Sequence, residues 1–161
     1  MSYELSTHVT SNSLSAAFKV GFNSGVALLA NTTLLGKTSI AFSGSWSDYA
    51  VLQLKIITRL QAGATSATAS VAISTDSGAT FFLSMNISAT MSALQITMHD
   101  FTVMGGNNQN LKIIQGITAQ SDANRLASTA TATLGFINQI NYATSATMGG
   151  GQAFLYGYRD T

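Results

Sequence analysis

Cysteine and proline are both absent from this sequence of 161 residues. Without cysteine the chain has neither a disulfide framework nor a thiolate metal site. Long apolar runs are missing too: Gly, Ser, Lys or Thr interrupts the most apolar stretches within about ten residues, well short of a membrane-spanning helix. The N-terminus has no basic start and no continuous apolar segment, so it lacks the features of a secretory signal. We therefore expect a soluble product with no membrane insertion.

Charge is also scarce. Charged residues make up 8% of the chain, against about 25% in ordinary soluble domains. Seven Lys and Arg residues and six Asp and Glu residues give a formal net charge of +1, which argues against a nucleic-acid protein because such a protein carries a basic patch. The polar surface must consist mostly of Ser, Thr, Asn and Gln. Such a surface gives little electrostatic repulsion between molecules, so we expect part of it to be buried in oligomer contacts.

The few ionisable side chains suggest no catalytic chemistry. His99 and Asp100 are neighbours on a presumed strand, so their side chains point to opposite faces and form neither an acid–base pair nor a metal pair by themselves. No Gly-x-Ser-x-Gly motif occurs, and the glycine runs at 105–106 and 149–151 lack the Lys-Ser/Thr of a phosphate loop. Calcium binding by Asp76 and loop carbonyls is conceivable, but no acidic repeat supports it. We predict no enzyme and no catalytic, cofactor-binding or metal-binding residues.

What the chain does contain is alternation with a period of two. It is clearest in residues 46–85, which we interpret as three consecutive strands around which the rest is organised. In the first, Leu52, Leu54 and Ile56 share a mostly apolar face, and Gln53 and Lys55 share the other. A helix is the alternative for this run, but an Ala-Thr-Ser repeat follows it. The second predicted strand covers residues 67–74, and the third begins at residue 80.

Asp76 and Gly78 lie between the second and third of these predicted strands. The Asp side chain can accept hydrogen bonds from backbone N–H groups ahead of it, and Gly adopts a positive φ without a steric penalty. We therefore predict that Asp76 and Gly78 form the structural turn of a hairpin.

Further alternating segments follow the same pattern along the chain. We expect a turn-like break at 31–33, a loop or single helical turn at 119–128 and a Gly-ended loop at 144–151. Strands are predicted at 38–42, 94–103, 111–118, 131–141 and 152–158. Short strands separated by Gly, Ser and Asn loops indicate an all-β fold, and we predict a single-domain jelly-roll-like β-sandwich of roughly 8–10 antiparallel strands over residues 25–161. Residues 1–24 form either a first strand or an N-terminal arm that docks on a neighbouring subunit.

Trp46 and Tyr49 stand at the entrance to the first central strand. Aromatic faces of this kind can stack on a sugar ring, and they are equally able to plug the end of a sandwich core. We keep both residues as candidate ligand or contact residues, with the core role the more common of the two.

Three motifs, in order, resemble small jelly-roll structural domains of tailed bacteriophages, which occur in tail fibre, receptor-binding and virion surface proteins. The first is a polar-aromatic entrance and alternating strand at 46–54. The second is a strand–Asp–x–Gly–Ala–x–aromatic hairpin at 73–82. The third is the Gly-rich lead into a Leu-Tyr-Gly strand at 149–158. The hairpin differs from the family pattern, since Ser-Thr-Asp stands where Asn-Gly-Asp is usual.

The resemblance covers about residues 38–158 and implies a virion location, homo-oligomers that are often trimers, contacts with other virion proteins and no catalytic residue. Our first hypothesis is a non-enzymatic virion structural protein on the particle surface, as a tail fibre or tail-tip component in host attachment. The alternatives are a capsid decoration protein and a carbohydrate-binding module that recognises a host-surface saccharide through Trp46 and Tyr49.

Overall fold

The computed structural model describes residues 25–64, 67–89, 91–107, 111–119, 124–133 and 135–159, so the predicted arm or strand at 1–24 lies outside the described residues. Within these ranges the secondary structure is all strand, and no helix is long and apolar enough to cross a membrane. The strands are β1 (Val26–Thr33), β2 (Ser39–Ser43), β3 (Tyr49–Leu60), β4 (Ala67–Ser74), β5 (Leu83–Ala89), β6 (Thr97–Met104), β7 (Leu111–Ala119), β8 (Asn124–Ala132), β9 (Gln139–Thr144) and β10 (Met148–Arg159).

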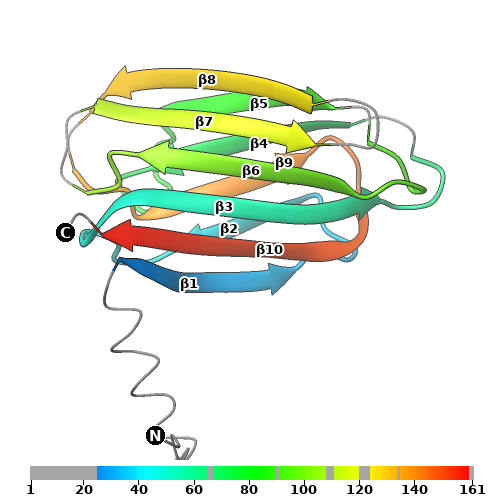
Figure 1. Cartoon of the computed structure of the whole chain (residues 1–161), viewed down its shortest axis with the longest axis horizontal. Helices are drawn as coiled ribbons and strands as arrows, with labels where there is room; N and C mark the ends of the chain where they lie inside the picture. The colour runs from blue at the N-terminus through cyan, green and yellow to red at the C-terminus, as the bar shows by residue number, and fades with distance from the viewer. Residues whose placement is uncertain are drawn as a thin grey trace, which may run out of the picture.

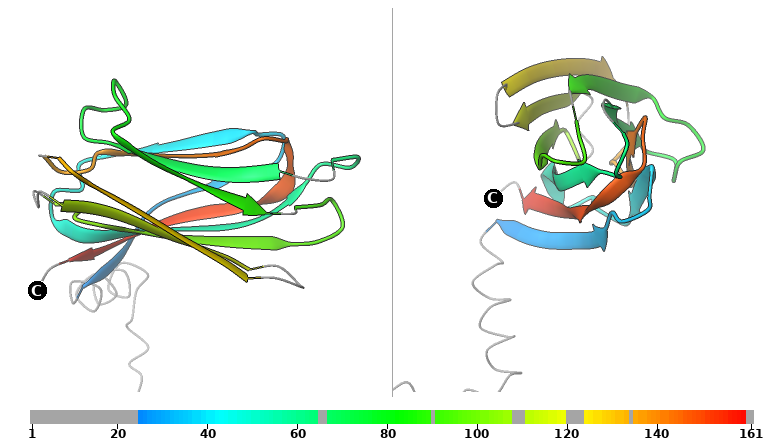
Figure 2. Two further views of the ribbon diagram at one scale, coloured as in Figure 1. Left: turned by 90° about the horizontal axis from the view of Figure 1, so that it is seen from above. Right: turned by 90° about the vertical axis from the view of Figure 1, so that its right-hand side faces the viewer.

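The strands form two sheets that lie face to face (Figure 2). The six-stranded sheet, nearest the viewer in Figure 1, has the order β1-β10-β3-β6-β7-β8, and the four-stranded sheet behind it has the order β2-β9-β4-β5. Every pairing among these strands is antiparallel. The predicted all-β sandwich is confirmed.

The strand order has a simple internal logic. Without the hairpin of β7 and β8, the remaining strands pair as 1-10-3-6 in one sheet and 2-9-4-5 in the other. This arrangement of eight strands in two interlocking antiparallel sheets is that of a jelly roll. The β7–β8 hairpin is an addition that widens only one sheet, and it makes β3 and β6 the two middle strands of that sheet.

The core lies between the sheets and follows from the alternation of side chains along each strand. Leu52, Leu54 and Ile56 of β3 are fully buried, and they belong to one hydrophobic cluster with Val71 and Ile73 of β4. Because successive side chains of a strand point to opposite faces, the residues between these buried ones point away from the core. The two outer surfaces of the sandwich are therefore set by the intervening residues.

Several predicted boundaries were wrong, and backbone pairing explains most of them. Residues 124–128, predicted as part of a loop or helical turn, belong to β8, the last strand of its sheet, and β8 pairs along its whole length with β7. The break predicted at 31–33 lies inside β1, where these residues pair with β10. In both segments polar residues form a strand because the neighbouring strand supplies the hydrogen-bond partners.

The glycine run at 149–151 lies inside β10 rather than in a loop, because it pairs with the end of β3. The strand predicted over 131–141 is interrupted: β8 ends at Ala132 and β9 begins at Gln139. Between them Gly135 has a φ of 90°. Two further strands start later than predicted, β5 at Leu83 and β6 at Thr97.

Candidate functional site

The two outer surfaces of the sandwich differ sharply in chemistry. The outward side chains of the four-stranded sheet are small or polar. They are Ser39, Ala41, Ser43, Thr68, Ser70, Ala72, Ser84, Asn86, Gln139, Asn141 and Ala143. This surface has the composition expected of a β-sandwich face that stays in water.

The outward surface of the six-stranded sheet, called the outer face from here on, is largely apolar. Leu28, Ile57, Met98 and Ile117 are 42–51% exposed on it. The large apolar and aromatic side chains of the outer face are Val26, Leu28, Val51, Ile57, Met98, Met104, Leu111, Ile113, Ile117, Phe154, Tyr156 and Tyr158. An exposed apolar surface this broad is a candidate contact surface, whereas single exposed apolar residues are ordinary.

A central polar cluster of Gln53, Lys55, Asp100 and Tyr158 lies in the middle of the outer face. The Gln53 Nε2 group donates to both carboxylate oxygens of Asp100, at 2.8 and 2.9 Å, and its Oε1 accepts from the Tyr158 hydroxyl at 2.5 Å. The Lys55 ammonium lies 3.7 Å from Asp100 Oδ2. Lys55 and Asp100 are direct cross-strand partners on β3 and β6. A polar cluster surrounded by apolar side chains is the anatomy of a specific protein contact surface.

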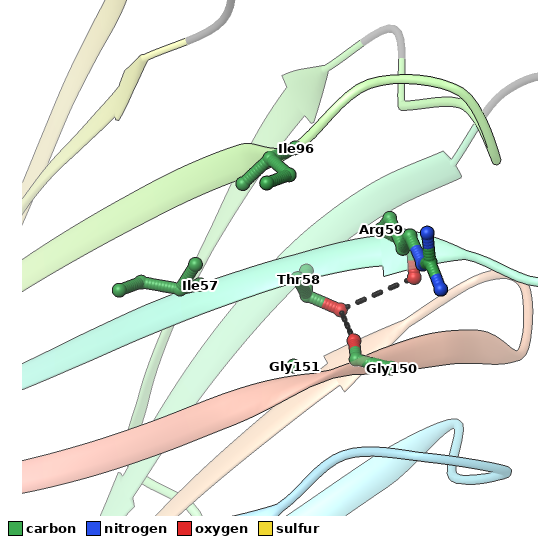
Figure 3. Close-up of a pocket in the computed structure, with 6 residues that line it drawn as sticks. All are labelled: Ile57, Thr58, Arg59, Ile96, Gly150 and Gly151. Atoms are coloured by element: carbon green, nitrogen blue, oxygen red, sulfur yellow. Dashed lines mark hydrogen bonds between the residues drawn. The ribbon is translucent and has the colours of Figure 1, made fainter.

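One end of the outer face carries a shallow depression of about 230 Å³ around the end of β3 (Figure 3). Ile57 and Ile96 supply apolar walls, Gly150 and Gly151 leave the floor open, and Arg59 stands at the edge. The Thr58 hydroxyl is turned into the sheet, where it donates to the Gly150 carbonyl at 2.9 Å. The depression therefore extends the apolar outer face toward one exposed cation.

Trp46 and Tyr49, the candidate ligand residues, lie at the opposite end of β3. Trp46 is only 5% exposed and belongs to the main hydrophobic cluster, so its indole presents no free face to a ligand. Tyr49 is half-buried against the same cluster, and the Arg159 guanidinium lies 5.5 Å from its ring centroid. Saccharide binding through these two residues stays a prediction, and the burial of Trp46 does not favour it.

Asp76 and Gly78 occupy the connection between β4 and β5. Asp76 Oδ1 accepts from the Ser74 hydroxyl at 2.6 Å and from the Thr80 backbone N–H at 2.8 Å. These hydrogen bonds, that of Ser74 above all, hold the pKa of the Asp76 carboxyl below its usual value. Ser77 and Gly78 both have positive φ, 58° and 85°. Asp76 and Gly78 therefore lie where a turn role is possible, and the Asp76 carboxylate accepts its hydrogen bonds from residues of the same connection.

The described residues include one buried histidine, which lies among aromatic side chains. His99 of β6 is 1% exposed, its Nδ1 lies 2.8 Å from the Thr118 hydroxyl, and burial lowers its pKa to about 4. Its ring packs at 6.0 Å from Phe101 and 5.8 Å from Tyr142. Within the described ranges no three His, Asp or Glu side chains lie close enough to hold a metal ion. The outer face is therefore the best candidate for a functional surface.

The sequence showed both faces of each strand but did not identify the outer face as a site. The available signal was the presence of strands that are apolar on both sides, as in Ile57 on the polar side of β3 and Ile113 and Ile117 along β7. Strands that are buried on both faces are apolar on both sides. In a sandwich only one face of each sheet meets the core, so a second apolar face is a candidate contact surface.

Comparisons with known proteins identify no family. No family model matches the chain, and no curated protein matches it. Among solved structures it is similar to a galectin from Caenorhabditis elegans, with a TM-score of 0.43, 9% identity and coverage of 78% of this chain and 94% of that one. It is also similar to a fructosyltransferase from A. japonicus, with a TM-score of 0.41, 11% identity and coverage of 94% of this chain and 28% of that one. TM-scores this low carry no argument about function.

Proposed function

We propose that this chain is a non-enzymatic structural protein of a bacteriophage virion surface, and that it acts by binding protein subunits through its outer face in a symmetric oligomer. The observation that carries the assembly role is the contrast between the two surfaces of one sandwich. One is Ser, Thr, Asn, Gln and Ala throughout, and the other presents Leu28, Ile57, Met98 and Ile117 at 42–51% exposure. Burying such side chains releases about 25 cal/mol per Å².

The virion location is supported by the three sequence motifs at 46–54, 73–82 and 149–158, which resemble bacteriophage jelly-roll domains. The strand order of the eight jelly-roll strands is compatible with that resemblance. A tail fibre or tail-tip position is the leading version of the proposal; the resemblance implies a homo-oligomer, often a trimer, without fixing the number of copies that meet at the outer face. A capsid decoration protein is the alternative version, and it uses the same outer face on a different particle surface.

Light scattering on matched variants tests the assembly role. Ile117→Lys places a charge on the outer face, and Asn86→Lys places the same charge on the exposed surface of the four-stranded sheet. We expect the wild-type chain and Asn86→Lys to assemble equally, and Ile117→Lys to assemble at least about tenfold more weakly, since a buried unpaired charge opposes association. Equal assembly of the two variants would contradict the role of the outer face.

Immunogold electron microscopy tests the location. We expect an antibody against the chain to label intact phage particles, at the tail for a fibre component and over the shell for a decoration protein. If the antibody labels free protein in the lysate but leaves the particles unlabelled, a virion role is excluded, whatever the oligomeric state.

A further inference from the structure

The centre of the outer face carries one cation and one anion side by side. β3 and β6 are the middle strands of the six-stranded sheet. Lys55 is midway along β3, Asp100 is midway along β6, and the two are direct partners 3.7 Å apart. Both side chains remain more than a third exposed, at 48% and 38%. Their charges are therefore available to a partner on the opposite side of an interface.

We propose that the occupant of the outer face is a second copy of this chain, packed face to face about a two-fold axis that runs between β3 and β6 and parallel to them. This inference rests on the proposed assembly role of the outer face and names its partner. Such an axis brings β3 of one copy over β6 of the other. Lys55 of each copy then lies opposite Asp100 of its partner, so the two central ion pairs become a square of alternating charges.

The remaining rows of the outer face match under the same operation. Each row is a set of cross-strand partners, and the axis superposes its β3 member on the β6 member of the other copy. The superposed partners are Val51 with Met104, Gln53 with Thr102, Lys55 with Asp100, and Ile57 with Met98. Apolar rows therefore meet apolar rows, polar meets polar, and opposite charges meet. Self-complementarity of this kind is what an isologous contact requires.

The flanking strands are complementary as well. β10 and β7 lie at equal distances on either side of the axis. The aromatic side chains of β10 therefore face the outward side chains of β7. Phe154 and Ile117 belong to the Lys55 row, Tyr156 and Gln115 to the Gln53 row, and Tyr158 and Ile113 to the Val51 row. Aromatic side chains packed on branched aliphatic ones form good interface cores.

The size of the outer face suits a stable pair. Six strands spaced about 4.8 Å apart and paired over about eight residues of 3.3 Å cover roughly 750 Å². A standard stable interface buries about 800 Å² on each partner. Two twisted sheets packed in this way keep their strand directions within about 30° of each other, which leaves the central rows in contact.

Charge reversal and mixing test the two-fold arrangement. Lys55→Glu makes the centre wholly negative, and Asp100→Lys makes it wholly positive. We expect each variant alone to self-associate at least about tenfold more weakly than the wild type, because like charges meet across the axis. Mixed in equal amounts, the two should form a 1:1 heterodimer with near wild-type affinity, and added salt should weaken it.

The control pair is Ser70→Glu and Asn86→Lys, which are direct partners on the four-stranded sheet and should leave the wild-type dimer unchanged. Circular dichroism establishes that each variant is folded. A wild-type trimer or monomer, single variants that still dimerise, or a mixture that stays monomeric would each overturn the two-fold pair. The proposed assembly role has its own readout: if Ile117→Lys abolishes a wild-type trimer, the outer face is the contact and only the two-fold pair is wrong.

Discussion

His99 is a buried base whose neutral form the fold requires. It is 1% exposed, and its ring is enclosed by Phe101 and Tyr142 while only Nδ1 has a hydrogen-bond partner among the described residues, the Thr118 hydroxyl. Burial lowers its pKa from 6.5 to about 4. An imidazolium there would lose its hydration, and no carboxylate among the described residues forms an ion pair with it.

This burial predicts a specific pH dependence of stability. Between pH 6.5 and about 4, His99 is protonated in the unfolded chain and neutral in the native protein. The contribution of neutral His99 to the free energy of unfolding is therefore fully present above pH 6.5, and it is lost as the pH falls toward 4. The difference between the two pKa values corresponds to about 3 kcal/mol. Urea unfolding at pH 7.5, 5.5 and 4.5 measures it. His99→Gln should remove this slope, and a slope unchanged in that variant would show that other groups cause it.

Trp46 tests the distinction between core and ligand roles at a single position. Because its indole is 5% exposed inside the main cluster, we expect Trp46→Ala to lower the free energy of unfolding by about 3–5 kcal/mol. Phe81→Ala, at a 38% exposed ring in the β4–β5 connection, should cost less than about 1 kcal/mol. Thermal and urea unfolding measure both variants. A Trp46→Ala chain with wild-type stability and lost saccharide binding would instead establish a ligand role.

At the scale of elements, β10 depends on glycine where it passes the end of β3. Gly151 has a φ of 118°, and a Cβ there would overlap the Ile57 carbonyl oxygen and lie 2.8 Å from the Thr58 Cα. These are backbone atoms of the neighbouring strand, so no side-chain rotation relieves the clash. The glycine run therefore lets the last strand approach the central one closely.

A matched pair of glycine variants isolates this close approach. Gly63, in the β3–β4 connection, has a similar φ of 90°, and a Cβ added there would meet nothing within 4 Å. Gly63→Ala should cost about 1 kcal/mol from backbone strain alone. Gly151→Ala should cost roughly 3 kcal/mol or more beyond that, or prevent folding. Urea midpoints that differ little between the two would show that β10 can shift away from β3.

Whether a strand could be predicted from the sequence depends on whether core packing or backbone pairing holds it in place. β3, β4 and β7 alternate apolar residues toward the core, so their period of two located them closely from the sequence. β8 and the second half of β1 consist mostly of Ala, Thr, Ser and Asn, and they are strands because the backbone of a neighbouring strand pairs with them. The local amino-acid composition of such a segment does not indicate which strand will pair with it. The glycine run at 149–151 was misassigned as a loop for the same reason.

At the scale of the whole molecule, sheet topology creates the candidate site. The central polar cluster joins Gln53 to Asp100, 47 residues away, and to Tyr158, 105 residues away. No spacing pattern links them, because they meet only where β10, β3 and β6 lie side by side (Figure 1). The sequence indicated low charge and oligomer contacts, but only the folded order of strands separates a polar surface from an apolar one.

The central claim is that the outer face is buried against protein when the chain assembles, and hydroxyl-radical footprinting of the unmodified chain tests it most directly. Met98 is 51% exposed on the outer face, and Phe81 is 38% exposed in a loop outside it. Both side chains react readily when they are accessible. As concentration rises from dilute monomer to assembled protein, we expect Met98 oxidation to fall several-fold while Phe81 oxidation stays constant. Equal oxidation of Met98 in the dilute and assembled states would contradict the account.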